Sequence, residues 1–287
     1  MYAKMVLVLC FVLLTMSCIE NSAVDLQAHI SRAITNSSYR GPSAAEFDLA
    51  KELFKRTLSA RNVTAELKTN WAKLGFELRE VEQCGETFLL LAEPVGREEG
   101  RGWYIFRTNN TGKTAIQAPH ARNDVRTGVI GLKFFLAGPC RAYAASTITR
   151  HRADVAHLEQ TYFQAFTLAF AEVCPTGLVV QLHGFDPHQH KSIKGDIVAS
   201  AGTNQPMPWL KELVEQLAKA TSLTVLAYPD DTRQLGATTN AQAKALRSHP
   251  HCRFLHLEMT QQLRERLLND EQLQRAFVNI LLNFQTQ

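Results

Sequence analysis

The sequence predicts an α/β fold with three layers, in which helices cover both faces of a central mixed, mostly parallel sheet. Short apolar runs such as 178–182 (LVVQL) and 223–228 (LTVLAY) have the continuous hydrophobicity of strands that are buried on both faces. Segments with apolar residues at helical spacing separate these runs, which is the pattern of helices that pack on a sheet. With 287 residues, 45% of them hydrophobic, the chain can bury such a core.

The expected elements alternate along the chain. From Pro42, apolar residues recur at helical spacing as far as Leu58, and a second helix is expected around 62–74. The expected strands are 87–92, 103–108, 114–119, 141–147, 178–182, 196–200, 223–228 and 253–257. The further expected helices are 127–137, 154–172, 208–220, 238–247 and 260–282. The first two strands are predicted to form an antiparallel hairpin at one edge of the sheet, through the polar loop 93–102.

The amino-terminal segment has the layout of an export signal. In residues 1–17, Lys4 precedes a short apolar run, and small polar residues follow it, as in a signal peptide. The segment before Cys18 resembles a lipoprotein cleavage box, although Thr15 stands where an aliphatic residue is usual. We therefore expect export to the periplasm or outer membrane as a lipoprotein anchored at Cys18. Plain secretion and an uncleaved anchor are the alternatives.

Two further segments follow the signal in this interpretation. Residues 18–41 are polar and are expected to form a tether between the lipid anchor and the fold. Residues 42–287 contain no internal repeat and no further linker, so we expect them to form one α/β domain. The membrane is then a partner only through the lipid at Cys18.

Charge and cysteine usage exclude several classes of protein. The formal net charge is only +4, and no Lys/Arg tract could follow a phosphate backbone, so a nucleic-acid partner is not expected. No CxxC motif is present, which excludes zinc-ribbon and thioredoxin-like sites. Outside the export segment, the thiols could form two disulfides or remain buried and free, and their pairing stays open. These thiols are Cys84, Cys140, Cys174 and Cys252.

Titratable side chains follow several of the predicted strands where those strands end. Strand 114–119 leads into His120 and Asp124, 178–182 into His183 and 253–257 into Glu258. Ligands of open α/β sheets bind at the carboxyl ends of the strands, so these residues are expected to converge. Two histidines and one carboxylate are the usual protein ligands of a catalytic zinc ion.

The sequence therefore predicts one zinc ion held by His120, Asp124 and His183, with Glu258 as the base that takes a proton from water. For each of these residues, a purely structural role is the alternative. His183 could be a structural residue held by hydrogen bonds, and Asp124 or Glu258 could cap the helix that follows it. We assign no chemical role to the other eight histidines. His188 and His190 with Asp186 are rival ligands on an apparent surface loop, whereas Asp154 and His157 are expected to contact each other on one helix.

Three segments, in chain order, resemble the zinc-dependent N-formylglutamate amidohydrolases and, more distantly, the zinc carboxypeptidases. They are 118–128 (APHARNDVRTG), 181–185 (QLHGF) and 256–264 (HLEMTQQLR), and the resemblance covers roughly 114–265. It implies a phosphorylase/hydrolase-like sheet, the same three zinc ligands and Glu258 as base. The HxxxD spacing of His120 and Asp124 departs from the HxxE spacing of the carboxypeptidases.

The resemblance also implies residues that bind the substrate. A basic residue that holds the oxyanion or a substrate carboxylate falls on Arg150 or Arg152, and Arg150 is favoured because it lies nearer the strand end. Segment 235–240 (LGATTN) resembles a substrate-side loop, which makes Asn240 a candidate substrate contact.

The expected function is zinc-dependent hydrolysis of an amide bond outside the cytoplasm. A small peptide, an N-acyl amino acid or a peptidoglycan fragment is the expected substrate, and its extracellular location is inferred from the export segment alone. One alternative is a non-catalytic periplasmic lipoprotein that binds a metal or ligand with the same fold. Another is a metal-dependent esterase; a phosphoesterase is disfavoured because the chain has no phosphate-cradling glycine loop and few carboxylates for a second metal.

Overall fold

The computed structural model of the protein describes residues 25–33, 38–83, 85–108 and 112–284. The predicted signal peptide (1–17) and the predicted lipid anchor at Cys18 lie outside these residues. Within the described ranges, no helix combines the length and apolar character needed to cross a lipid bilayer.

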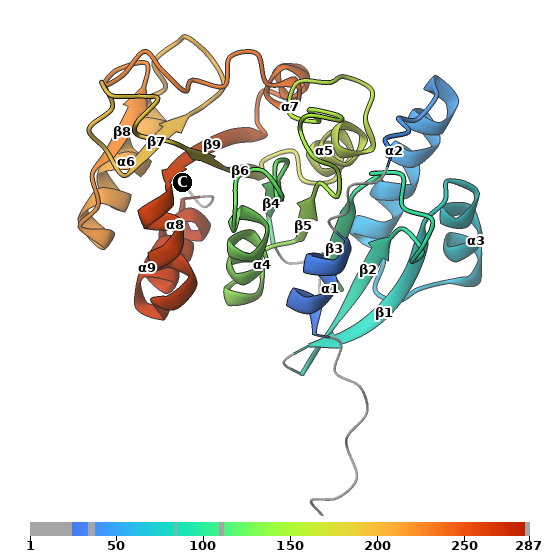
Figure 1. Cartoon of the computed structure of the whole chain (residues 1–287). Helices are drawn as coiled ribbons and strands as arrows, with labels where there is room; N and C mark the ends of the chain where they lie inside the picture. The colour runs from blue at the N-terminus through green and yellow to red at the C-terminus, as the bar shows by residue number, and fades with distance from the viewer. Residues whose placement is uncertain (1–24, 34–37, 84, 109–111, 285–287) are drawn as a thin grey trace, which may run out of the picture.

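A nine-stranded mixed sheet forms the centre of the described structure, which confirms the predicted α/β fold (Figure 1). The strands are β1 (Glu77–Gln83), β2 (Glu86–Ala92), β3 (Trp103–Arg107), β4 (Thr114–Ala118), β5 (Ala142–Ala145), β6 (Leu178–Phe185), β7 (Ile197–Ser200), β8 (Val225–Tyr228) and β9 (Arg253–Thr260). Their spatial order is β1-β2-β3-β5-β4-β6-β9-β7-β8. The pairings of β4 with β5, β4 with β6, β6 with β9 and β7 with β8 are parallel, and the other four are antiparallel, so the sheet is evenly mixed.

Helices cover both faces of this sheet, as predicted. They are α1 (Leu26–Ala33), α2 (Ala44–Ser59), α3 (Ala65–Lys73), α4 (Thr127–Ala137), α5 (Tyr162–Val173), α6 (Pro208–Thr221), α7 (Ala241–Ala245), α8 (Gln261–Asn269) and α9 (Glu271–Asn283). One buried apolar cluster joins the sheet to α1, α4, α6, α8 and α9, and a second joins its other face to α2, α3, α5 and α7. Figure 1 shows these two helical layers on opposite sides of the strands.

Three helix boundaries differ from the sequence prediction, in each case because a polar side chain caps a helix. The helix expected at 154–172 begins only at Tyr162, where the Thr161 side chain accepts a hydrogen bond from Gln164 N. The helix expected at 260–282 is divided at Asp270, which ends α8 and whose side chain caps α9. The helix expected at 238–247 becomes the short α7, which begins after the cap residue Asn240.

Two elements were not expected from the sequence. Strand β1 is a polar edge strand with only Leu78 and Val81 buried, so its hydrophobic signal is weak. As a result, the predicted hairpin of β2 and β3 forms, but β1 occupies the edge of the sheet.

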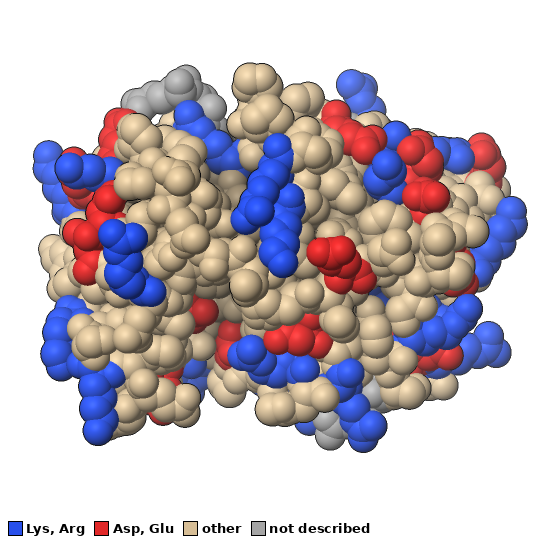
Figure 2. Space-filling model, turned by 90° about the horizontal axis from the view of Figure 1, so that it is seen from above, with Lys and Arg blue, Asp and Glu red and all other residues tan. Residues whose placement is uncertain are grey.

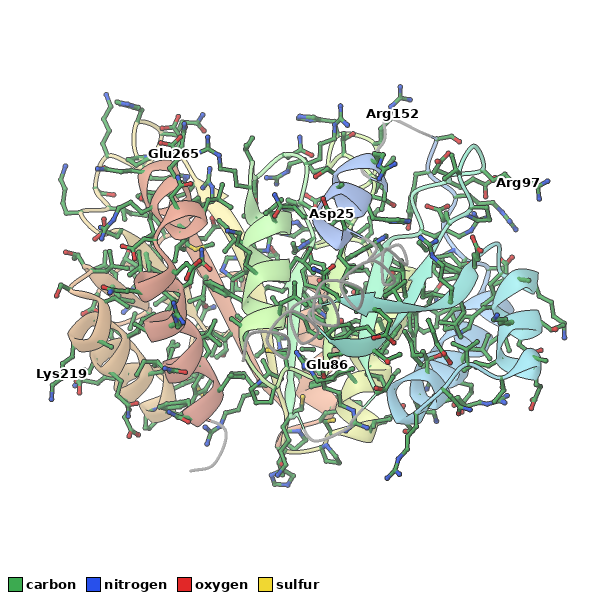
Figure 3. The ribbon with its side chains drawn as sticks, turned by 90° about the horizontal axis from the view of Figure 1, so that it is seen from below. Asp25, Glu86, Arg97, Arg152, Lys219 and Glu265 are labelled. Carbon is green, nitrogen blue, oxygen red and sulfur yellow. The ribbon has the colours of Figure 1, made fainter. Side chains whose placement is uncertain are left out.

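The second unexpected element is α1, which lies in the predicted tether. Asp25 caps it by accepting hydrogen bonds from Gln27 N and Ala28 N (Figure 3). Leu26 and Ile30 are buried in the cluster that contains the sheet. The tether prediction for 18–41 is therefore wrong over residues 25–33, because these apolar side chains pack on the core.

The described cysteines are free thiols. Cys140, Cys174 and Cys252 are buried and form no disulfide with one another, and Cys84 lies outside the described residues. Burial raises the pKa of the Cys140 and Cys252 thiols to about 12, so these thiols are protonated and unreactive at neutral pH. Of the two alternatives, disulfides or buried free thiols, the three described cysteines show the second.

The fold brings the predicted site residues to one place through the parallel pairing of β6 and β9. In this pairing, Gln181 lies opposite His256, and His183 lies opposite Glu258. Residues two apart in a strand project from the same face of the sheet, so these four side chains form a polar patch on one face. Strand β4, on the other side of β6, leads into the turn that carries His120.

Candidate metal centre

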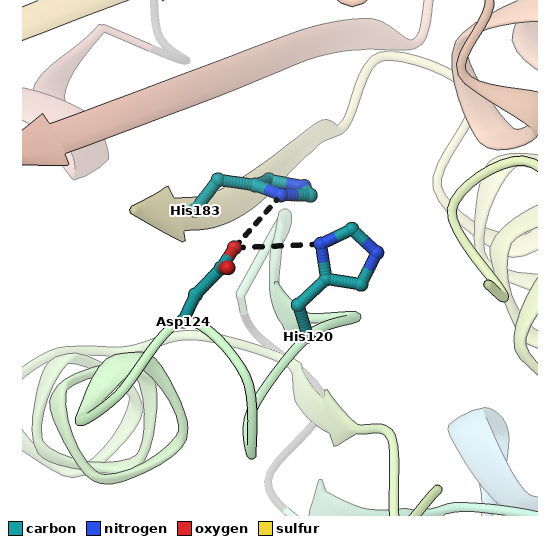
Figure 4. Close-up of side chains that lie close together, drawn as sticks. All are labelled: His120, Asp124 and His183. Atoms are coloured by element: carbon teal, nitrogen blue, oxygen red, sulfur yellow. Dashed lines mark ion pairs between the residues drawn. The ribbon is translucent and has the colours of Figure 1, made fainter. Parts of the chain in front are cut away.

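His120, Asp124 and His183 meet at the carboxyl ends of β4 and β6. A tight turn follows β4, in which Asp124 N donates to His120 O at 2.8 Å and returns both side chains to the same side. Asp124 Oδ2 lies 3.4 Å from His120 Nδ1 and 3.3 Å from His183 Nδ1 (Figure 4). All three side chains are buried. The structure therefore assembles the three ligands predicted from the sequence.

Asp124 does not serve as a helix cap, which was the alternative, purely structural role expected for this residue. Helix α4 begins after Arg126, and no side chain caps its first turn. The same oxygen of Asp124, Oδ2, also contacts the sheet, where it accepts a hydrogen bond from Gly184 N at 3.1 Å. The carboxylate is thus held between the turn and strand β6.

Hydrogen bonds on the far side of each imidazole decide which nitrogen faces Asp124. His120 Nε2 lies 2.7 Å from Asp154 Oδ1, and His183 Nε2 lies 3.3 Å from Gln181 Oε1. Carboxylate and amide oxygens only accept, so each Nε2 carries the proton and donates it. In the neutral imidazoles, both Nδ1 atoms then present a lone pair toward Asp124.

Three acceptor atoms that face one another repel, and a cation between them would relieve this repulsion. His120 Nδ1 is buried and has no hydrogen-bond partner. Two imidazole nitrogens and one carboxylate oxygen form the donor set of a catalytic zinc site that keeps an open coordination position. The residues present therefore fit a metal ion of this kind. The ligand atoms lie within 4.8 Å of one another.

The electrostatics of the three residues follow from the same contacts. Burial lowers the pKa of His183 to about 4, so this imidazole is neutral and can act as a ligand at neutral pH. Burial also disfavours charge on His120, but the adjacent carboxylates of Asp124 and Asp154 outweigh it and raise the pKa of His120. Burial opposes ionisation of Asp124 as well, yet its close contacts with His120 and His183 lower its pKa.

Glu258 lies beside His183 on the neighbouring strand β9. Its side chain is only 13% exposed, and its Oε2 is buried without a hydrogen-bond partner. Burial, followed by the nearby charge of Asp124, raises the pKa of the Glu258 carboxyl to about 8. Glu258 does not cap α8, because the side chain of Thr260 takes that role. A carboxyl with a pKa near neutrality suits proton transfer.

His256 also belongs to this site, although no partner was predicted for it. Its ring lies 4.4 Å from that of His183, centroid to centroid, and its Nε2 lies 3.6 Å from Glu258 Oε1. His183, His256 and Glu258 form a second group whose ligand atoms lie within 4.8 Å of one another. The prediction that only two histidines lie in the site is therefore wrong. The spacing of two residues to Glu258 was the signal, since it places both side chains on one face of the strand.

Asp154 was the second residue that the sequence did not assign to the site. It does contact His157, as predicted, with 3.1 Å between Oδ2 and His157 Nδ1. However, the segment before Thr161 forms turns rather than the expected helix, and Asp154 Oδ1 reaches His120. Carboxylates that accept from a metal-binding histidine orient the ring and raise its basicity.

The structure distinguishes the two candidate arginines. Arg150 lines the cleft above the site, its backbone N donates to Asn123 Oδ1 at 2.8 Å, and its guanidinium lies 3.3 Å from Asp154 Oδ2. Arg152 is exposed, does not line the cleft, and lies at the edge of the molecule in Figure 3. The structure therefore places Arg150, and not Arg152, in the lining of the cleft, and the substrate-binding role of Arg152 stays a prediction.

Asn240 has a structural role that the sequence did not predict. Its side chain is 2% exposed, and its Oδ1 accepts from Gln242 N and Ala243 N at 3.0 Å, which caps α7. Its Nδ2 donates to Gln181 Oε1 at 2.9 Å. The amide is thus committed to the helix cap and to Gln181, while Asn240 also lines the cleft, so its role as a substrate contact stays a prediction.

An open cleft of about 350 Å³ lies over these residues. Part of its wall is the segment from Leu235 to Thr239, together with Arg233. Leu235 and Ala237 have positive φ angles of 61° and 51°, and Gly236 between them packs so closely on the Tyr228 ring that a Cβ atom would lie 2.4 Å from it. Backbone strain of this kind is often found in walls of functional sites.

A second hollow of about 430 Å³ adjoins the cleft at Asp124 and Gly184. His188 lines it from an exposed loop, and His190 contacts Gln234 Oε1 at 3.0 Å. In the described residues, neither histidine belongs to a group that could hold a metal ion, so they form no rival site. On the face of the molecule shown in Figure 2, basic and acidic side chains are interspersed.

Comparison with known proteins finds no matching family model and no matching curated protein sequence. Solved structures that resemble this chain include an N-formylglutamate amidohydrolase from Ralstonia eutropha JMP134, 17% identical over 61% of this chain and 93% of that one, with a TM-score of 0.40. A bacteriophage poly-gamma-glutamate hydrolase is 11% identical over 71% and 91%, with a TM-score of 0.39. A metallo-carboxypeptidase from Burkholderia cenocepacia is 12% identical over 79% and 70%, with a TM-score of 0.40.

Proposed function

We propose that the protein is a zinc-dependent hydrolase that cleaves an amide bond. One observation carries this proposal: the Nδ1 atoms of His120 and His183 and the Oδ2 of Asp124 converge while both Nε2 atoms are committed to other acceptors. This arrangement is unfavourable without a cation and matches the ligand set of a catalytic zinc ion. The proposal of zinc rather than another divalent metal rests on the nitrogen-rich donor set.

When bound, a zinc ion at these residues would polarise the substrate carbonyl and increase the acidity of a water molecule. Glu258 is the base in this proposal. It takes one proton from the attacking water, whose oxygen bonds to the carbonyl carbon, and delivers that proton to the amine nitrogen as the C–N bond breaks. Its buried position next to His183 and its raised pKa support this role.

Arg150 is the residue that we assign to the developing negative charge. It lines the same cleft as Glu258 and His183, and its side chain is 41% exposed, so it can move toward a bound substrate. A guanidinium at this position would stabilise the oxyanion or hold a carboxylate of the substrate. Its ion pair with Asp154 orients it in the absence of substrate.

The proposed substrate is a small peptide, an N-acyl amino acid or a peptidoglycan fragment. The cleft of about 350 Å³ is open and largely polar in its lining residues, which supports a small polar substrate. The proposed location outside the cytoplasm, as a lipoprotein or a secreted protein, rests on the sequence of residues 1–18 alone.

The experiment measures zinc content and hydrolysis of a panel of peptides and N-acyl amino acids with the purified full chain. The variant Glu258→Gln should keep its zinc and lose activity by at least about 100-fold, since a general base contributes roughly that factor or more. The variant His183→Ala should lose the zinc itself. His190→Ala is the control, because this histidine lies outside the cleft and should retain both properties.

The other outcomes distinguish the alternatives. Zinc binding without hydrolysis of any substrate in the panel would favour a metal- or ligand-binding protein. Hydrolysis of ester analogues without hydrolysis of amides would favour an esterase. A wild-type protein that binds no metal ion after incubation with zinc would overturn the proposal.

A further inference from the structure

A network of buried amide side chains lies behind His183, on the side away from Asp124. Its members are Gln117, Gln181, Gln242 and Asn240, and each is at most 2% exposed. Buried amides must satisfy both their donors and their acceptors within the protein, because unpaired polar groups are costly in the interior. The network is therefore ordered, and the direction of each amide can be followed from bond to bond.

Two backbone carbonyls set these directions, because a carbonyl oxygen can only accept. At one end, Gln242 Nε2 donates to Val155 O at 2.9 Å. At the other end, the Thr167 hydroxyl donates to Phe163 O at 3.0 Å, so its oxygen accepts from Gln117 Nε2 at 2.8 Å. Both glutamines are then left with their Oε1 atoms facing inward.

These two oxygens decide the orientation of Gln181. Its Nε2 donates to Gln117 Oε1 at 2.8 Å and to Gln242 Oε1 at 3.0 Å, which uses both of its hydrogens. Its Oε1 therefore points the other way and accepts from Asn240 Nδ2 at 2.9 Å. The same oxygen lies 3.3 Å from His183 Nε2, which must donate to it.

We propose that Gln181 is a positioning residue that holds His183 in the tautomer with hydrogen on Nε2, so that Nδ1 is free to bind a metal ion. This inference rests on the proposed function in its use of His183 as a metal ligand. A reversed Gln181 amide would place two N–H groups against each other at His183 and would also break the bonds with Gln117 and Gln242. The orientation of a buried amide thus determines which nitrogen of the imidazole is the ligand.

The network also connects this tautomer to the wall of the cleft. Asn240 ends the segment from Leu235 to Thr239 that lines the cleft, and it shares the Gln181 oxygen with His183. A displacement of this wall that moved Asn240 would therefore change the hydrogen bonding of the oxygen that orients His183. The single atom Gln181 Oε1 therefore links the segment 235–239, through Asn240, to His183.

Gln117 provides a matched control for Gln181. The two residues lie opposite each other on the paired strands β4 and β6, and both are completely buried. Gln117 contacts Gln181 and Thr167 in this network and makes no hydrogen bond with His183. The substitution of either residue by methionine removes one amide from the same core at similar volume, so the costs in stability should be comparable.

The test compares Gln181→Met with Gln117→Met in the full chain. Zinc affinity is measured by competition with a chromophoric chelator, and the tautomer of His183 is measured in the metal-free protein at neutral pH from its ¹⁵N chemical shifts. We expect Gln181→Met to bind zinc roughly 10- to 100-fold more weakly, which is the usual effect of losing such a partner. Gln117→Met should lose much less zinc affinity than Gln181→Met, because Gln242 Oε1 still accepts from Gln181 Nε2 and keeps the amide in the same orientation. Only Gln181→Met should populate the tautomer with hydrogen on Nδ1.

Equal losses of zinc affinity in the two variants would overturn the inference, since that result would indicate a general effect on the core. A wild-type spectrum with hydrogen on Nδ1 of His183 would also overturn it, and this measurement remains decisive if Gln181→Met fails to fold. If the wild type binds no zinc, the proposed function fails, whereas the wild-type spectrum still tests the orientation of His183.

Discussion

His120 and Asp154 form a short hydrogen bond on the side of the imidazole that faces away from the metal centre. The distance between His120 Nε2 and Asp154 Oδ1 is 2.7 Å, and the two residues are 34 positions apart in the chain. Asp154 also contacts Arg150 and His157 through its other oxygen. Although burial disfavours its charge, hydrogen bonds with His120 and His157 lower the pKa of Asp154, so it accepts from His120 as a carboxylate.

The variant Asp154→Asn should bind zinc about 10- to 100-fold more weakly, because an amide accepts less strongly from His120 and leaves Nδ1 less basic. Competition with a chelator measures the affinity. His157→Ala is the control: it removes a partner from the other oxygen of Asp154 at a side chain that is 45% exposed, and it should change the affinity little. Unchanged zinc affinity in Asp154→Asn would show that this hydrogen bond does not support the ligand.

Glu258 should make the stability of the metal-free protein depend on pH. Its pKa is about 8 in the folded protein, against an ordinary value of 4.5. Above pH 4.5 the unfolded chain releases this proton while the folded protein retains it, so the folded state binds more protons. The free energy of unfolding therefore falls as pH rises, and the contribution of the protonated carboxyl is lost by about pH 8.

The variant Glu258→Gln lacks this titration and should gain stability relative to the wild type between pH 6.5 and 8. The difference should grow by up to about 1.4 kcal/mol for each pH unit. Denaturant unfolding in the presence of a chelator measures it. His183 is present in both proteins, so its own titration cancels in the difference between them. A difference that is constant with pH would contradict the raised pKa of Glu258.

Gly184 has no room for a side chain because Arg264 crosses it. A Cβ atom at Gly184 would lie 2.0 Å from Arg264 Nη1 and 2.4 Å from its Cζ. The guanidinium donates to Met259 O at 2.5 Å and to Val125 O at 3.0 Å, which ties the turn that carries Asp124 to strand β9. This close approach explains why a residue without a side chain follows His183 directly.

The variant Gly184→Ala should be less stable by about 1–3 kcal/mol, because the arginine has to move from a well-packed position. Thermal unfolding measures the loss. In an Arg264→Ala background, the three atoms nearest to the added methyl group are absent, so the same substitution should cost much less. Additive effects of the two substitutions would show that the contact with Arg264 is not the cause.

The burial of α1 predicts that the amino-terminal helix contributes to stability. Ile30 is completely buried in the core cluster, and Ile30→Ala should lower the free energy of unfolding by about 2 kcal/mol or more. The control is Ser31→Ala, at the exposed neighbouring position. Denaturant unfolding of the two variants checks this. Equal stability of Ile30→Ala and the wild type would indicate that residues 25–33 act as a tether and do not stabilise the core.

Much of the fold and part of the site could be predicted because the signals are local. The apolar runs of β4, β6 and β9 identify buried strands, and His120, Asp124 and His183 are recognisable because each follows or ends such a run. The edge strand β1 and the helix α1 escaped prediction, since one is mostly polar and the other is short and lies next to the export signal.

The export segment and the resemblance of the motifs come from the amino-acid order, and no folding is needed to see them. The tertiary structure determines everything that depends on how separate elements align. The parallel register of β6 and β9 brings His256 to His183, the turns before Thr161 carry Asp154 to His120, and the cap of α7 directs Asn240 to Gln181. Ten histidines in a sequence are ten candidates; register, capping and burial determine which of their nitrogen atoms face one another.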